Sequence, residues 1–192
     1  MSGSADEPAW GEAEAATAEQ ARAWSAWRSA AAQSEIDTAI RELYRSLDAD
    51  IAARGPTCWQ SGNCCNFGVY GHRLYVTALE VAWFLGRAPE RQAETGDTSG
   101  PQDRSIALPL ADSKADEVCP FQIDRACSMH AIRPLGCRVF FCQAGTEAWQ
   151  HAVYEQYLEA LRALHDRYGI AYRYADWLAL LDEAARADRE KS

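Results

Sequence analysis

The chain has 192 residues, with 19 basic and 28 acidic side chains and a formal net charge of −9 at pH 7, and its length suits one modest domain. Because acidic side chains outnumber basic ones, the chain has no overall positive charge to attract nucleic acid or an anionic membrane surface, and we expect neither as a partner. No stretch approaches the roughly 18 uninterrupted apolar residues of a membrane span, and the acidic, alanine-rich N-terminal region does not resemble a signal peptide, so we expect a cytoplasmic protein.

The N-terminal part of the chain is predicted to be helical after a short lead-in. Residues 1–20 are polar and are expected to be mobile. Apolar residues between 24 and 51 recur mostly at three- and four-residue steps, which predicts a long helix or a helix pair over 20–53. The Gly55-Pro56 pair then ends the helix.

The middle of the chain is predicted to contain a short strand, a capped helix and a loop. Residues 72–76 have the composition of a strand. Thr77 and Glu80 form a capping box, which starts a helix that runs toward Gly86, so Glu80 has a structural role and is not a candidate catalytic acid. Residues 87–104 lack periodicity and are predicted to be a mobile surface loop.

The C-terminal half is predicted to combine irregular structure with two more helices. A short strand is expected over 105–110, a turn at Asp124-Arg125, and a first helical position at Pro134. Apolar stripes predict a helix from near 146 to Gly169 and another over 177–185.

The predicted fold class is mainly α, or α+β with minor short strands. Residues 21–192 are expected to form one domain, in which helices scaffold an irregular, cysteine-rich metal-binding core over 55–142.

The seven cysteines are the main candidate functional residues of this sequence. Because their number is odd, they cannot all form disulfides within one chain. The first group is Cys58, Cys64 and Cys65, and the second is Cys119, Cys127, Cys137 and Cys142. In a reducing compartment such a dense set of thiols indicates metal ligands. Two distant groups that share a metal would also order a segment with little apolar periodicity.

The spacing of the cysteines matches no ordinary zinc-finger pair. Adjacent Cys64 and Cys65 could bind neighbouring irons of a cluster, or two separate metals, more easily than one tetrahedral ion. More than four thiolates favour an iron-sulfur cluster, for example of the 4Fe-4S kind, while zinc stays open as the alternative.

Several motifs around the cysteines occur in a fixed order. They are Cys58, Cys64-Cys65, Cys119-Pro120-Phe121, Cys127-Ser128-Met129-His130, Arg133-Pro134-Leu135-Gly136-Cys137-Arg138 and Phe140-Phe141-Cys142, with Thr77 and Glu80 between the groups. Over roughly residues 55–142 the chain thereby resembles the YkgJ-like CxxCxxCC cysteine-cluster family of zinc- or iron-chelating domains. The resemblance implies that the cysteines bind metal, and it implies no reaction.

Two departures from the family pattern affect the expected ligand set. Ser61 stands where the family has a second cysteine, and His130 stands where it usually has tyrosine. His130 is therefore a candidate eighth ligand, since imidazole binds zinc and replaces cysteine in some two-iron clusters. The alternative for His130 is a structural role.

Arg133 and Arg138 flank Cys137 and are the candidate cofactor-binding residues. They could donate hydrogen bonds to sulfur, neutralise thiolate charge or bind an anionic substrate. The alternative is that they cap helix ends or form ion pairs.

Three classes of function follow from these residues. The first is a metal-binding protein whose iron-sulfur cluster serves a redox or metal-handling role. The second is a zinc-stapled interaction module, because seven thiols and His130 suffice for two closed tetrahedral sites. The third is an enzyme, either a small protein-modifying methylase or a thiol oxidoreductase that uses Cys137 between its two arginines. The flagellin lysine methylase, a distant relative of the resembled family, carries an iron-sulfur cluster, which favours iron and does not imply methyltransferase activity for this chain.

Overall fold

The structure is a computed structural model that describes residues 10–58, 61–95 and 118–189. Its α-helices are α1 (Trp10–Ala31), α2 (Ser34–Arg54), α3 (Phe67–Tyr70), α4 (Ala78–Thr95), α5 (Leu135–Val139), α6 (Glu147–Tyr168) and α7 (Trp177–Arg189). Two short 3₁₀ helices are η1 (Asn63–Cys65) and η2 (His130–Ile132), and the strands are β1 (Tyr75–Thr77), β2 (Gln122–Ile123), β3 (Ala126–Cys127) and β4 (Tyr174–Asp176). The predicted mainly α fold with short strands is confirmed.

The N-terminal helical region is a pair, broken at residues 32–33 between α1 and α2. The predicted mobile lead-in over 1–20 is wrong for residues 10–20, because α1 already begins at Trp10. Trp24, Ile40 and Leu47 are fully buried, as the apolar stripe predicted.

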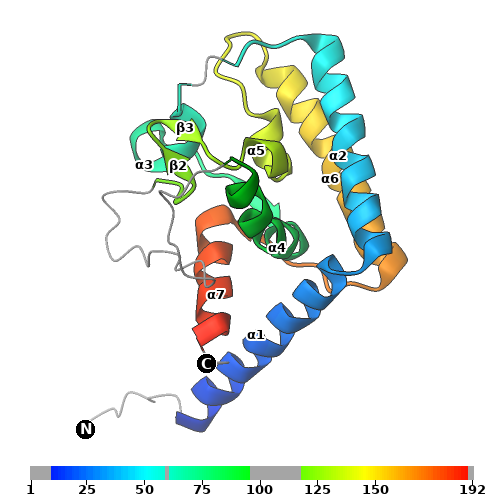
Figure 1. Cartoon of the computed structure of the whole chain (residues 1–192), viewed down its shortest axis with the longest axis vertical. Coiled ribbons are helices and arrows are strands. Elements are labelled where there is room, and N and C mark those ends of the chain that lie inside the picture. The colour runs from blue at the N-terminus through cyan, green and yellow to red at the C-terminus, as the bar shows by residue number, and fades with distance from the viewer. Residues whose placement is uncertain (1–9, 59–60, 96–117, 190–192) are drawn as a thin grey trace, which may run out of the picture.

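The longest helices frame one side of the molecule. α2 and α6 lie side by side, and α1 crosses below them and packs against α4 and α7 (Figure 1). Gly55 and Gly169 end α2 and α6 with φ of 67° and 62°, a left-handed conformation that glycine adopts without steric cost. Both predicted helix ends are therefore confirmed.

Helix α4 begins at the predicted capping box but extends further than expected. Its predicted end at Gly86 is wrong, and residues 87–95 are helical rather than part of a loop. The extra turns are anchored because Arg87 pairs with Asp37 of α2 and stacks over the Trp83 ring. The predicted strand over 105–110 lies outside the described residues.

The Glu80 carboxylate joins three elements. It accepts hydrogen bonds from the Thr77 backbone N–H (2.8 Å), the Tyr44 hydroxyl of α2 (2.8 Å) and the Leu135 N–H at the start of α5 (2.9 Å). Glu80 is 1% exposed, so this network is almost free of competing water. The structural role predicted for Glu80 is confirmed.

Two antiparallel strand pairs complete the fold. β1 pairs with β4, with Val76 opposite Ala175, so the strand predicted over 72–76 occurs slightly later in the chain. β2 and β3 form a hairpin whose two turn residues, Asp124 and Arg125, have φ of 49° and 65°. Positive φ at both positions is typical of a type I′ turn, which confirms the predicted turn.

Helix α5 starts one residue later than predicted, with Pro134 at the N-cap and Leu135 as its first residue. The hairpin and α3 lie on the side of α5 away from the α2–α6 pair (Figure 1). Among the described residues, no helix has both the length and the apolar character required to cross a membrane.

Candidate functional site

The first cysteine group is shaped by a tight turn at Gly62. Gly62 has φ of 76° and precedes η1, and the Cys65 N–H donates to the Gly62 carbonyl at 3.1 Å. This turn directs the neighbouring thiols Cys64 and Cys65 toward the same region, with their Sγ atoms 3.8 Å apart. Adjacent cysteines can therefore act together here.

The second cysteine group docks onto this turn through the backbone. The Cys119 N–H donates to the Cys65 carbonyl at 2.7 Å, and the Gln122 side chain donates to the Gly62 carbonyl at 2.7 Å. A Cβ atom at Gly62 would lie 2.5 Å from the Arg125 carbonyl oxygen, so only glycine permits this approach.

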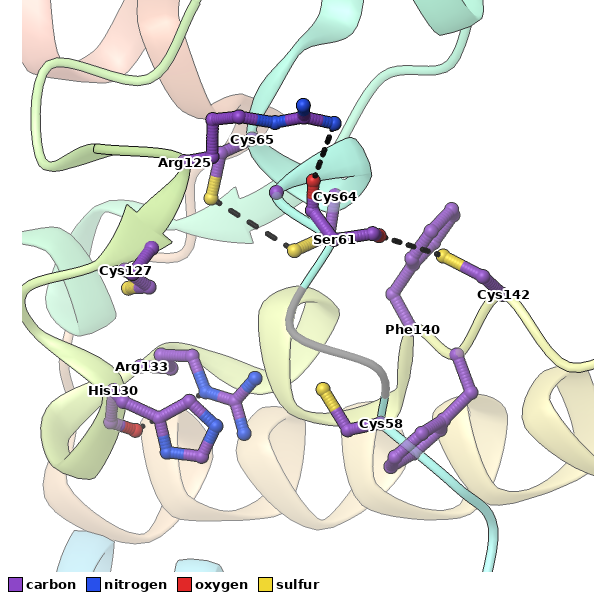
Figure 2. Close-up of a pocket in the computed structure, with 13 residues that line it drawn as sticks. Cys58, Ser61, Cys64, Cys65, Arg125, Cys127, His130, Arg133, Phe140 and Cys142 are labelled. Carbon is purple, nitrogen blue, oxygen red and sulfur yellow. Dashed lines mark hydrogen bonds between the residues drawn. The ribbon is translucent and has the colours of Figure 1, made fainter. Parts of the chain in front are cut away.

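All seven thiols line one or both of two adjoining cavities. The inner cavity, about 20 Å³, is lined by Cys64, Cys65, Cys119, Cys127 and Cys137 together with apolar side chains. The outer cavity, about 140 Å³, is lined by Cys58, Cys64, Cys65, Cys127 and Cys142 (Figure 2). Because Cys64, Cys65 and Cys127 line both, residues spread from 58 to 142 in the sequence meet at one place.

Four of the sulfurs form one electrostatically coupled group. Contact with the sulfurs of Cys119, Cys127 and Cys64 strongly raises the pKa of Cys65, which favours its thiol form, and this thiol has a single proton that it can donate to one neighbour at a time. With the Cys65 thiol as donor, the pKa of Cys64 is lowered to about 6 or that of Cys127 to about 7, depending on which sulfur accepts the proton. Thiolates are thereby favoured at neutral pH, and a thiolate is the form that binds metal.

Trp177 supports this group from the first turn of α7. Its indole N–H donates to the Cys119 Sγ at 3.4 Å in a buried contact, which stabilises the thiolate form of Cys119. From the sequence, Trp177 was predicted only to lie in a helix, because the spacing of the apolar residues in α7 does not indicate a contact with Cys119.

Cys137 behaves differently from the other inner thiols. Burial raises its pKa well above the ordinary value, so its thiol is protonated at neutral pH. Burial thus disfavours the thiolate of Cys137, and Arg138 pairs with Asp48, so neither feature supports the hypothesis of a reactive thiolate between two arginines. Cys64 is the more acidic thiol.

His130 and Ser61 both line the outer cavity. The Ser61 hydroxyl lies 3.7 Å from the Cys142 Sγ, so serine stands among the thiols at the position where a cysteine was expected (Figure 2). Partial burial and the charge of Arg133 lower the pKa of His130, which favours the neutral imidazole that can bind a metal.

The structure separates the two candidate cofactor-binding arginines. Arg133 lines both cavities. Arg138 lines neither; its guanidinium forms a bidentate ion pair with Asp48 of α2 at 2.9 Å, donates to the Ala131 and Arg133 carbonyls, and stacks over the Tyr44 ring. The ion-pair alternative thus holds for Arg138, which fixes α5 to α2.

Two other histidines, His72 and His165, occupy positions that the spacing of the sequence did not indicate. His72 stacks on Phe140, with ring centroids 4.6 Å apart, and its Nε2 lies 3.4 Å from the Cys64 carbonyl oxygen, beside the thiols. His165 of α6 is only 1% exposed and is therefore part of the buried core.

The donor chemistry and one distance suit a metal. Four sulfurs bound at 2.3 Å to a tetrahedral ion are separated by about 3.8 Å, which is the Cys64–Cys65 separation. However, across the part of the chain that the structure describes, no three His, Cys, Asp or Glu side chains are grouped so that they could hold a metal ion. The geometry therefore shows converged thiols, and not a formed coordination site.

Comparisons of this chain with protein-family models, curated proteins and solved structures found no match. The likeness to the YkgJ-like family thus stays a prediction from motifs.

Proposed function

We propose that this chain is a metal-binding cysteine-cluster protein of the YkgJ-like kind, and that its thiols hold an iron-sulfur cluster with a redox or metal-handling role. The observation that carries the proposal is the convergence of all seven cysteines on two cavities that share Cys64, Cys65 and Cys127. Isolated buried cysteines pack as small apolar side chains, but seven at one place need a common chemical role.

Two features favour a cluster over a single ion. The set contains more than four thiols, and soft sulfur ligands suit iron-sulfur clusters. A cavity needs only about 10–15 Å³ to hold one water-sized particle, so the outer cavity, at about 140 Å³, has room for a group of several atoms.

The ligands would come from Cys58, Cys64, Cys65, Cys119, Cys127, Cys137 and Cys142, with His130 as a candidate eighth donor. A bound iron-sulfur cluster supplies one-electron transfer. The chain's own groups would tune it: Trp177 donates to the Cys119 sulfur, and Phe84, Phe121 and Met129 line the inner cavity and exclude water.

Zinc is the second candidate, and the inner sulfurs favour it. The 3.8 Å separation of Cys64 and Cys65 suits a tetrahedral ion, and the inner cavity, at about 20 Å³, admits one ion only. In this case the metal would stabilise an interaction module and perform no redox chemistry.

We propose that the protein acts in the reducing cytoplasm, because a dense set of metal-binding thiols stays reduced there. Its acidic net charge supports a role without nucleic-acid or membrane-surface partners.

The proposal is tested by elemental analysis and visible absorption of protein purified without oxygen. Brown protein with iron and acid-labile sulfide is the expected result. Colourless protein with stoichiometric zinc would establish the second candidate instead, and protein without bound metal would contradict both.

A matched pair of variants would locate the metal. Cys119→Ser removes an inner thiol and should lower the metal content, while Cys58→Ser removes an exposed thiol that lines the outer cavity alone. Loss of metal from both variants indicates one shared centre, and loss from Cys119→Ser alone assigns the metal to the inner thiols.

A further inference from the structure

The two exposed cysteines of the candidate site lie apart from the inner thiols. Cys58 and Cys142 line only the outer cavity, whereas the other five cysteines line the inner one. Figure 2 shows Cys58 and Cys142 on the side of the outer cavity opposite Cys127. These two thiols can share a metal with the inner thiols only if the backbone that carries them is held in place.

Gln150 of α6 holds the residue before Cys142 with both ends of its side-chain amide. The Phe141 backbone N–H donates to Gln150 Oε1 at 3.1 Å, and Gln150 Nε2 donates to the Phe141 carbonyl at 2.9 Å. Two facing residues of an antiparallel sheet exchange the same pair of hydrogen bonds. Residues 140–143 belong to no helix or strand, so the side chain of Gln150 takes the place of a neighbouring strand.

The Gln150 amide is itself fixed in one orientation. Its Nε2 also donates to Thr146 Oγ1 at 2.6 Å, and the Thr146 hydroxyl in turn donates to the Gln143 carbonyl at 2.6 Å. Thr146 is only 3% exposed, so water competes little for these bonds. Exchange of the amide oxygen and nitrogen would break all three contacts of Gln150.

Gln143 extends these hydrogen bonds to the first cysteine group. Its Oε1 accepts from the Thr57 backbone N–H at 2.8 Å, and Thr57 directly precedes Cys58. The bonds from α6 therefore reach the backbone on both sides of Cys142 and the residue next to Cys58.

We propose that Gln150 and Gln143 are positioning residues of the metal centre, which present Cys142 and Cys58 to the inner thiols. In this arrangement the Cys142 Sγ lies 3.7 Å from the Ser61 hydroxyl, so Cys142 already faces the turn that carries the first cysteine group. The inference rests on the proposed function, because it concerns two of the proposed ligands.

The other role open to these hydrogen bonds is general stabilisation of the fold, since Thr146 is the N-cap residue of α6. In either role, loss of the bonds lowers the free energy of unfolding. The roles differ in which thiols become reactive, because only the positioning role affects the cysteine next to the lost bonds and leaves the inner thiols unchanged.

The test is alkylation of the metal-loaded full chain with iodoacetamide, with the modified cysteines identified by mass spectrometry. A free thiolate is the nucleophile, so a thiol that binds metal is protected. Gln150→Leu removes the bonds to Phe141 and should make Cys142 react about tenfold faster than in wild type. This factor corresponds to about 1.4 kcal/mol, within the loss expected for two hydrogen bonds. Cys119 should stay protected.

Gln143→Leu provides a second variant with a different signature. It removes the exposed bond to Thr57 and keeps the Gln143 carbonyl, so the fold should be retained and Cys58 should react faster. Tyr157→Phe is the matched control on α6, because the Tyr157 hydroxyl donates to Asp50 of α2 at 2.7 Å. This control should lower the free energy of unfolding without changing which cysteines are protected.

Metal content and unfolding curves are measured for every sample, so that the two proposals fail separately. Selective exposure of Cys142 in Gln150→Leu and of Cys58 in Gln143→Leu is the expected result. Protection as in wild type, or equal exposure of all seven thiols, in both variants overturns the positioning role and leaves the proposed function intact. Wild type without metal overturns the proposed function and, with it, this inference.

Discussion

The helical frame, formed by α1, α2, α4, α6 and α7, and the two cysteine segments, residues 61–71 and 118–128, are stabilised in different ways. The frame buries large apolar side chains such as Trp24, Leu161 and Leu180. In the cysteine segments, the buried apolar side chains other than the thiols are Phe67 and Phe121. Backbone hydrogen bonds and sulfur contacts take the place of a core there, so the frame should fold without a metal, whereas the cysteine segments should depend on one.

The largest expected effect is on the cysteine segments when metal is removed. A structural metal contributes on the order of 10 kcal/mol, so chelation should accelerate amide exchange in the cysteine segments by about a hundredfold or more. Exchange in α2 and α6 should change little. Hydrogen exchange followed by mass spectrometry measures both regions together, and equal protection with and without metal would show that no metal stabilises these segments.

Glu80→Ala should produce the largest loss within the frame. It leaves buried donors of Tyr44, Thr77 and Leu135 without an acceptor, and each such group costs about 1–3 kcal/mol, so we expect the free energy of unfolding to fall by about 3 kcal/mol or more. Denaturant unfolding measures this change.

Glu35→Ala is the control for Glu80→Ala, because the contact of Glu35 with Tyr168 is exposed. It should change the free energy of unfolding by no more than about 0.5 kcal/mol. Equal effects of the two substitutions would contradict the importance of the buried network.

Gly62→Ala should weaken the contact between the cysteine segments. The alanine would carry a positive φ and place its Cβ 2.5 Å from the Arg125 carbonyl oxygen, so we expect a loss of about 2–4 kcal/mol and a lower metal content. Gly71→Ala is a matched control, since Gly71 also has a positive φ but no atom within 4 Å of the added Cβ.

The control should lose only about 1 kcal/mol, the cost of the left-handed backbone. Unfolding curves and metal analysis of both variants give the comparison. Equal losses from Gly62→Ala and Gly71→Ala would mean that the close approach at Gly62 contributes nothing.

The smallest expected effect is a pH dependence of the free energy of unfolding, which arises from His165 in the helical frame. Burial lowers the pKa of His165 from 6.5, and its Nδ1 lies 3.2 Å from the Ile170 carbonyl oxygen, as expected for a neutral ring that donates one hydrogen bond. The unfolded chain therefore takes up a proton more readily than the folded one. The contribution of neutral His165 to stability is fully present above pH 6.5, and it is lost as the pH falls from that value toward the pKa of the folded state.

His165→Gln should weaken the dependence of the free energy of unfolding on pH between about pH 5 and 7, as measured by denaturant unfolding. His151→Gln, at an exposed position of the same helix, should leave the profile unchanged. An unchanged slope in His165→Gln would assign the pH dependence to other groups.

Local features of this fold were predictable because they depend on neighbouring residues. The Thr77–Glu80 capping box, the glycine ends at Gly55 and Gly169, and the Asp124-Arg125 turn are all set by hydrogen bonds or dihedral angles within a few residues. The end of α4 was not predictable, because the continuation beyond Gly86 depends on Asp37, a residue of another helix.

The candidate site was predictable as a set of residues and not as an arrangement. The sequence by itself determined the mainly helical fold and the two cysteine groups, because periodicity and residue chemistry are properties of the chain, and the family resemblance added His130 as a candidate donor. Only the tertiary structure decided which thiols lie together, that Trp177 reaches Cys119, and that Arg133 lines the cavities while Arg138 pairs with Asp48. These contacts join residues far apart in the chain, and their distances and burial exist only after the helices have packed.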